Sequence, residues 1–138
     1  MTKVYSKSLD QSLTIDRIIG KVKGKLPGPT LVFLAGIHGN EPSGVFAMNK
    51  VCEELRSEHL EIKGNLFAIA GNLWALEKGK RYHQEDLNRI WTSDKTQAWE
   101  QGTFEPKNED EKEQQDIFLT ISDILRNDTG PFYFFDLH

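Results

Sequence analysis

Residues 30–42 read Thr-Leu-Val-Phe-Leu-Ala-Gly-Ile-His-Gly-Asn-Glu-Pro, and they contain the clearest structural signal in the chain. Its first part, Thr30–Ala35, is an apolar run of strand formers, which predicts a buried strand that ends at Gly36. Pro42 suits the first turn of a helix. The apolar residues beyond it recur at helical spacing, at Val45, Met48, Cys52 and Leu55. The stretch therefore predicts a buried strand, a polar turn and a helix in succession.

Similar patterns elsewhere in the chain predict the remaining elements. We expect strands at 13–23, Leu66–Ala70 and Phe132–Leu137, helices at Leu73–Lys78 and Glu109–Arg126, a turn at Gly24–Pro29 and a loop at Ser93–Lys107. Asn108, three residues before Glu111, resembles a capping box at the start of the longer helix. Strands that alternate with helices are typical of an α/β fold with a mixed, largely parallel sheet and crossover helices. The chain length favours one domain.

The composition excludes several classes of protein. Hydrophobic residues make up 38% of the 138 residues, which is enough for a core, and no apolar run approaches the roughly 20 residues of a membrane span. The net charge of −4 argues against nucleic acid as a partner, and its excess lies in residues 100–116, which we expect to be a solvated loop and helix start. Cys52 is the only cysteine, so an internal disulfide and a multi-cysteine zinc site are excluded. No secretory signal opens the chain, and we expect a cytoplasmic protein.

Polar side chains follow two of the expected strands, at the position where α/β sheets bind ligands. His38 and Glu41 lie in the turn after the first strand, and an imidazole with a carboxylate suits zinc. Catalytic zinc takes three protein ligands, and His138, after the last strand, is the candidate for the third if the two strands are neighbours. Asp136 would face the same side as His138 and could orient its ring. The alternative is that His38 and Glu41 form a polar turn that only caps the helix.

A second polar cluster lies between these motifs, in residues 81–89. It contains Arg81, Asn88 and Arg89, and it could clamp a carboxylate because arginine offers a planar pair of donors. The alternative is a charged surface loop of Arg–Asp pairs.

Together these motifs resemble the succinylglutamate desuccinylase/aspartoacylase family, a branch of the zinc carboxypeptidase-like hydrolases. The resemblance rests on His38-Gly39-Asn40-Glu41, on Arg81 with Asp86-Leu87-Asn88-Arg89, and on Asp136-Leu137-His138, in that order. It extends over residues 38–138 and leaves residues 1–30 without a match.

The resemblance implies a fold, a reaction and roles for individual residues. The fold would be the N-terminal half of a three-layer catalytic domain. His38, Glu41 and His138 would bind Zn²⁺, Arg81, Asn88 and Arg89 would hold the substrate, and Asp86 and Asp136 would support the ligands from behind. The reaction would be hydrolysis of the amide bond of a small N-acyl amino acid, with no role for nucleic acid or membrane. Zinc would lower the pKa of its bound water, and a glutamate would act as general base.

The chain departs from the family at its end. The family's catalytic glutamate lies beyond the last zinc histidine, where this sequence stops, so we expect no general base within residues 1–138. The chain is expected to be a truncated, catalytically poor form. The sheet edges and apolar surface left exposed make self-association an expectation.

Three other functions are compatible with parts of the sequence. A zinc carboxypeptidase would use the same ligands on peptides, although Asp86-Leu87-Asn88-Arg89 favours the deacylases. A non-catalytic zinc-binding module would need no general base. An anion-binding loop at 36–44 is disfavoured, because the stretch lacks the lysine of a P-loop and the three-glycine spacing of a dinucleotide site.

Overall fold

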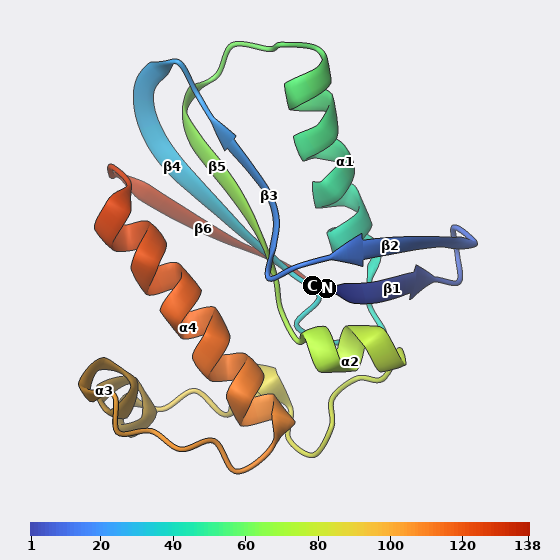
Figure 1. Ribbon diagram of the computed structural model, residues 1–138, viewed down its shortest axis with the longest axis vertical. Helices are drawn as coiled ribbons and strands as arrows, with labels where there is room; N and C mark the ends of the chain where they lie inside the picture. Colours follow the sequence, from blue (N-terminus) through green and yellow to red (C-terminus); the bar gives the residue numbers. More distant parts are fainter.

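A four-stranded sheet forms the centre of the computed structural model, which describes all 138 residues (Figure 1). Its strands are β3 (Ile18–Lys23), β4 (Leu26–Ala35), β5 (Lys63–Ala70) and β6 (Phe132–Leu137), in the order β3-β5-β4-β6. The pairs β5–β4 and β4–β6 are parallel, whereas β3 runs antiparallel to β5. The expected mixed, largely parallel sheet is confirmed, and β6 lies at one of its edges.

Two long helices cover the two faces of this sheet. Side chains alternate along β5, so Leu66 and Ala68 face α1 (Ser43–Ser57), whereas Phe67 and Ile69 face α4 (Glu109–Asn127). Figure 1 shows α1 and α4 on opposite sides of the strands. The expected three-layer arrangement is therefore present. No helix combines the length and the apolar character that crossing a membrane requires.

The shorter elements surround the ends of this sandwich. They are the hairpin strands β1 (Thr2–Ser6) and β2 (Gln11–Ile15), the helices α2 (Leu73–Lys78) and α3 (Ser93–Gln101), and the 3-10 turn η1 (Leu87–Arg89). The bounds of α2 agree with the prediction. Strand β4 begins at Leu26, so the expected turn at Gly24–Pro29 extends only to the start of this strand.

The prediction of one strand over residues 13–23 is wrong. The chain bends at Asp16-Arg17, so that β2 pairs with β1 and β3 joins the central sheet. Arg17 holds the bend because its guanidinium donates a hydrogen bond to the carbonyl of Ala70, 2.8 Å away, and pairs with the carboxylate of Glu113. These partners are distant in sequence, so the apolar pattern alone could not reveal the break.

The prediction of a loop over Ser93–Lys107 is also wrong, because α3 occupies its first part. The helix has a polar sequence and buries one large side chain, Trp99, which packs against Trp91, Phe104 and Phe118. Thr92 caps its start by accepting a hydrogen bond from the backbone N–H of Lys95. A helix held by a single tryptophan lacks the apolar stripe on which the prediction depended.

Candidate metal site

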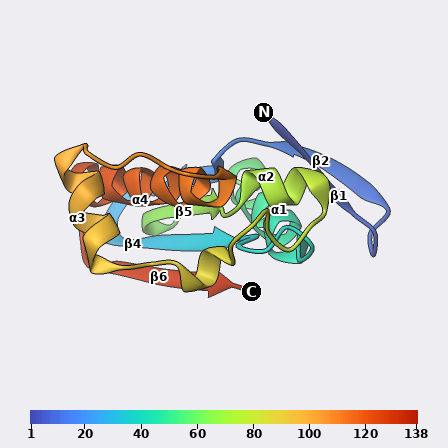
Figure 2. The same cartoon turned by 90° about the horizontal axis from the view of Figure 1, so that it is seen from below.

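The two histidine motifs meet at one end of the sheet because β4 and β6 are parallel neighbours. Ala35 pairs with Leu137, so the turn after β4 and the residue after β6 emerge at the same edge (Figure 2). This is the carboxyl end of both strands, where open α/β sheets bind ligands. The adjacency that the sequence argument required is therefore present.

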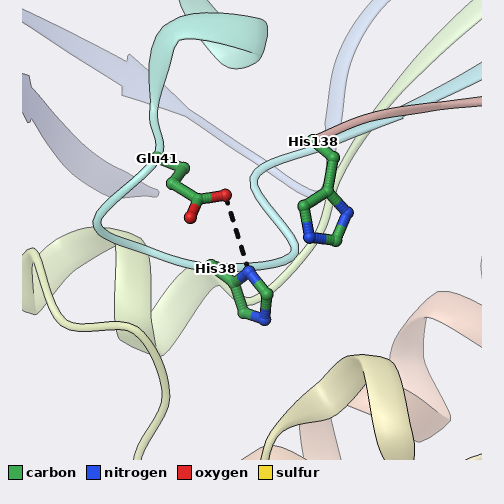
Figure 3. Close-up of side chains that lie close together, drawn as sticks. All are labelled: His38, Glu41 and His138. Carbon is green, nitrogen blue, oxygen red and sulfur yellow. Dashed lines mark ion pairs between the residues drawn. The ribbon is translucent and has the colours of Figure 1, made fainter.

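His38, Glu41 and His138 converge at this edge (Figure 3). Each offers one ligand atom, and the three atoms lie within 4.8 Å of one another. His38 Nδ1 is 3.5 Å from Glu41 Oε2, and the rings of the two histidines meet edge to face with centroids 4.9 Å apart. The cluster thus offers both predicted kinds of ligand atom, imidazole nitrogen and carboxylate oxygen, at distances that one metal ion could bridge.

The hydrogen bonds of His38 leave one buried atom unpaired. The side chain is 1% exposed, and its Nε2 donates to Asp86 Oδ1 at 2.9 Å, whereas Nδ1 is buried without any hydrogen-bond partner. An unpaired buried nitrogen that faces a carboxylate is costly unless a cation or proton satisfies it. The donor set therefore fits a divalent cation of the zinc type.

Two carboxylates orient the histidines, in the places expected for Asp86 and Asp136. Asp136 Oδ2 lies 3.0 Å from His138 Nδ1, so the opposite nitrogen, Nε2, is the one free to bind a metal. In the absence of a metal, the hydrogen bond that His138 donates to Asp136 raises the pKa of His138, with further contributions from the charges of Asp136 and Glu41. A metal ion would thus compete with a proton for this ring.

The pKa of Asp86 is lowered despite its partial burial. Burial alone would raise this pKa, but the hydrogen bonds from His38 and from the backbone N–H of Asn88, with the charge of Arg81, outweigh it. Asp86 therefore remains a carboxylate that accepts the hydrogen bond from Nε2 of His38, so Nδ1 is the ring nitrogen that faces Glu41.

Of the three expected substrate-binding residues, the structure brings Arg81 to the cluster. Its guanidinium lies 3.5 Å from Glu41 Oε1 and 3.4 Å from Asp86 Oδ2, and it remains half exposed. Asn88 and Arg89 lie in η1 beside it, with exposed side chains, and Arg89 Nε approaches Asp86 Oδ2 only to 3.8 Å. The loop thus presents one arginine at the cluster and two further polar side chains to solvent.

Close packing explains why a glycine lies between the two candidate ligands of the first motif. A Cβ atom on Gly39 would lie 2.0 Å from the carbonyl carbon of Ala75 in α2. The backbone N–H of Gly39 also donates to the carbonyl of Arg81 at 3.3 Å. The turn that carries His38 and Glu41 is therefore pressed against α2 and tied to the arginine loop.

The sequence argument missed the residue that anchors this loop, Asp110. It lies fully buried in the first turn of α4, where its carboxylate accepts hydrogen bonds from the backbone N–H groups of His83, Gln84 and Glu85. The expectation that residues 100–116 are solvated is thus wrong for their second half, in which Asp110, Glu111 and Glu113 are buried. A signal was present, because Asp110 is seven residues before Ile117 and so lies on the apolar face of the helix.

Comparison with known proteins places the chain in a family. A model described as the succinylglutamate desuccinylase/aspartoacylase catalytic domain matches residues 27–138. The chain belongs to this family. The succinylglutamate desuccinylase of Yersinia pestis is 37% identical over 62 residues, which cover 45% of this chain and 19% of the relative. The enzyme of the same name from Photorhabdus laumondii is 39% identical over the same share of each chain.

Solved structures from the family show the same fold. The succinylglutamate desuccinylase of Chromobacterium violaceum superposes with a TM-score of 0.68 over 86% of this chain and 35% of its own, at 18% identity. That of Vibrio parahaemolyticus gives a TM-score of 0.64 over 84% of this chain and 37% of its own, at 19% identity. The chain thus matches about a fifth of the curated relatives' length and about a third of the solved chains.

Proposed function

We propose that this chain contributes the zinc-binding part of a hydrolase that cleaves the amide bond of N-acyl amino acids. The observation that carries the proposal is the convergence of His38, Glu41 and His138, with an unpaired buried nitrogen on His38. Membership of the succinylglutamate desuccinylase/aspartoacylase family supports the reaction type. When bound, zinc would polarise the substrate carbonyl and lower the pKa of a coordinated water.

The residues of the chain have separate tasks in this proposal. His38, Glu41 and His138 hold the ion, while Asp86 and Asp136 fix the ring nitrogens that face it. Arg81 is the residue best placed to bind a carboxylate of the substrate, because it lies beside Glu41 and keeps an exposed guanidinium.

Asn88 and Arg89 have exposed side chains on η1, and these would add contacts to a substrate bound beside Arg81. We assign no general base within residues 1–138, because Glu41 acts as a ligand and Asp86 and Asp136 are paired with the histidines. The chain is therefore expected to bind substrate and zinc but to hydrolyse the amide slowly.

The first test is the zinc content of the purified chain, measured by elemental mass spectrometry after incubation with zinc and desalting. We expect about one ion per chain, lost in His38→Ala and in His138→Ala. His59→Asn is the matched control, because His59 is exposed, lies away from the cluster and has a positive φ of 51° that asparagine tolerates. Circular dichroism would confirm that each variant folds. Zinc retained at the wild-type level in folded His38→Ala would refute the site.

The second test uses calorimetry to compare the binding of N-succinyl-L-glutamate to the zinc-loaded chain with the binding of a peptide of similar size. Preference for the N-acyl amino acid, reduced in Arg81→Met, is the expected result. Equal binding of the peptide would favour carboxypeptidase-like recognition instead.

A further inference from the structure

A polar cavity of about 400 Å³ joins the candidate metal site to the N-terminal hairpin. Glu41 and His138 line it together with Ser6, Lys7 and Ser8. Apart from Pro42, every side chain that lines it carries a polar group. Its volume lies within the range of roughly 300–1,000 Å³ typical of small-molecule sites. The hairpin, which precedes the family match at residue 27, therefore borders the space in which a substrate of the metal site would lie.

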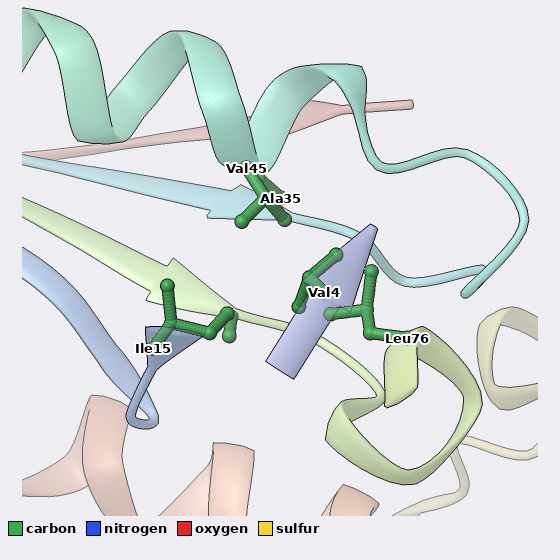
Figure 4. Close-up of a cluster of buried hydrophobic side chains, with 6 residues drawn as sticks. Val4, Ile15, Ala35, Val45 and Leu76 are labelled. Atoms are coloured by element: carbon green, nitrogen blue, oxygen red, sulfur yellow. The ribbon is translucent and has the colours of Figure 1, made fainter. Parts of the chain in front are cut away.

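The hairpin is packed against the catalytic sandwich rather than loosely attached. Val4 and Ile15 are buried against Ala35, Val45 and Leu76, which belong to β4, α1 and α2 (Figure 4). Burial of such side chains is worth about 1.5–3 kcal/mol each, enough to hold a two-stranded ribbon in place. The position of its turn relative to the metal site is thus fixed by the core.

The turn itself is ordered by a buried hydroxyl. Ser6 is 1% exposed, and its Oγ accepts a hydrogen bond from the backbone N–H of Leu9 at 3.4 Å and lies 3.2 Å from Ser8 Oγ. These contacts determine where the backbone of Lys7 leaves β1. The lysine is therefore presented to the cavity from a defined point.

Lys7 is the only lysine or arginine among the residues that line this cavity, and it takes part in none of the ion pairs of the structure. Arg81, in contrast, is already in contact with Glu41 and Asp86. We propose that Lys7 binds a second substrate carboxylate, distinct from the one that Arg81 holds, so that the hairpin turn selects N-acyl amino acids with an additional acidic group. This inference rests on the proposed function and adds the determinant of specificity.

The experiment compares three ligands on the zinc-loaded chain by calorimetry. N-acetyl-L-alanine has one carboxylate, N-acetyl-L-glutamate adds one on the side chain, and N-succinyl-L-alanine adds one on the acyl group. We expect one of the two dicarboxylates to bind about fivefold tighter than N-acetyl-L-alanine, which is what an exposed charge pair can supply. Which of the two is preferred identifies the carboxylate that Lys7 meets.

The variants separate the charge of Lys7 from a general effect. Lys7→Met keeps most of the side-chain length and should abolish the preference, whereas Lys7→Arg should keep it. Lys3→Met is the matched control, because Lys3 is also exposed on the hairpin but does not line the cavity. Zinc content should be unchanged in all three. The preference should also weaken with added salt.

Two results would overturn the inference while leaving the proposed function intact. These are equal binding of all three ligands by the wild type, and an unchanged preference in Lys7→Met. Binding of zinc without binding of any of the three ligands would instead refute the proposed substrate class, and the role of Lys7 with it.

Discussion

Replacement of Asp110 by asparagine should destabilise the chain and loosen the arginine loop. One oxygen, Oδ1, accepts from Asn72 Nδ2 at 2.9 Å and from the backbone N–H of His83 at 3.0 Å. The other, Oδ2, accepts from the backbone N–H groups of Gln84 and Glu85 at 2.6 and 2.9 Å. Asparagine is nearly the same size, so the change removes acceptors and charge without opening a cavity.

The magnitude follows from counting donors. The amide of asparagine keeps one acceptor oxygen, so the two donors at the other position lose their partner and face an NH₂ group. A buried donor without a partner costs about 1–3 kcal/mol, and bonds to a charged acceptor are at the upper end. We therefore expect the free energy of unfolding to fall by about 3–5 kcal/mol at pH 7, in line with the loss of one partner from a buried charged network. Since Asp86 lies next to the released segment, zinc affinity should fall as well.

The same residue predicts a pH dependence. Burial by itself would raise the pKa of Asp110, but the hydrogen bonds from Gln84, Glu85, His83 and Asn72 outweigh it and hold the pKa below its ordinary value. A carboxyl whose pKa is lower in the folded state stabilises the fold fully above its unfolded pKa of about 3.9. That contribution disappears as the pH falls from there through the lowered folded pKa. The variant lacks this contribution at every pH. The free energy of unfolding of the wild type should therefore fall towards that of the variant in acid.

Urea unfolding followed by circular dichroism, at pH 7 and at pH 3, would measure both effects. Asp123→Asn is the control, because Asp123 lies on the same helix, is 69% exposed and pairs only with Arg126. Its substitution should change stability by about 0.5 kcal/mol or less. The reasoning fails if Asp110→Asn costs less than about 1 kcal/mol at pH 7, or if the gap between variant and wild type does not narrow in acid.

Three further predictions concern other parts of the structure. Gly39→Ala should cost about 2 kcal/mol and reduce zinc binding, because the new Cβ cannot fit 2.0 Å from the carbonyl carbon of Ala75; urea unfolding and elemental analysis would show this, and wild-type values in both would contradict it. Leu87→Ala should cost about 2–5 kcal/mol, because Leu87 is fully buried between Ile37 and Ile117; a smaller loss by urea unfolding would mean that η1 is not part of the core. The chain should self-associate through the edge strand β6, where Phe134 is half exposed, and Phe134→Lys should shift it towards monomer in sedimentation velocity; an unchanged distribution would exclude this edge.

Local sequence pattern was sufficient for the elements with a continuous apolar face. Strand β4 and helices α1 and α4 could be predicted, because β4 is a continuous apolar run and each helix repeats apolar residues at helical spacing. The family motifs predicted three candidate ligands and the two carboxylates beside them. The bend at Arg17 and the helix around Trp99 were not predictable in this way. Each is stabilised by partners far away in sequence, Ala70 and Phe118 among them, and leaves almost no periodic signal.

The prediction that the acidic residues of 100–116 are solvated failed for a different reason. Charge runs are usually solvated because a buried carboxylate is costly. Here the cost is met by groups that composition cannot reveal. Asp110 accepts hydrogen bonds from the backbone N–H groups of residues 83–85. Glu111 pairs with Lys95 at 3.1 Å and accepts a hydrogen bond from the backbone N–H of Lys107. The pKa of Glu111 is accordingly lowered, although burial alone would raise it.

The three candidate ligands differ in how firmly the fold holds them, and this has a consequence for metal binding. His38 and Glu41 lie in a turn that packs on α2, and His38 is hydrogen-bonded to Asp86. His138, in contrast, is 40% exposed at the end of β6, which is an edge strand with one neighbour. If β6 shifted by one residue along β4, the side chain of His138 would move to the opposite face of the sheet, where Leu137 now points. Only the register that pairs Ala35 with Leu137 therefore completes the cluster. A metal that binds this register and no other must stabilise the pairing of β4 with β6 by the free energy of its binding.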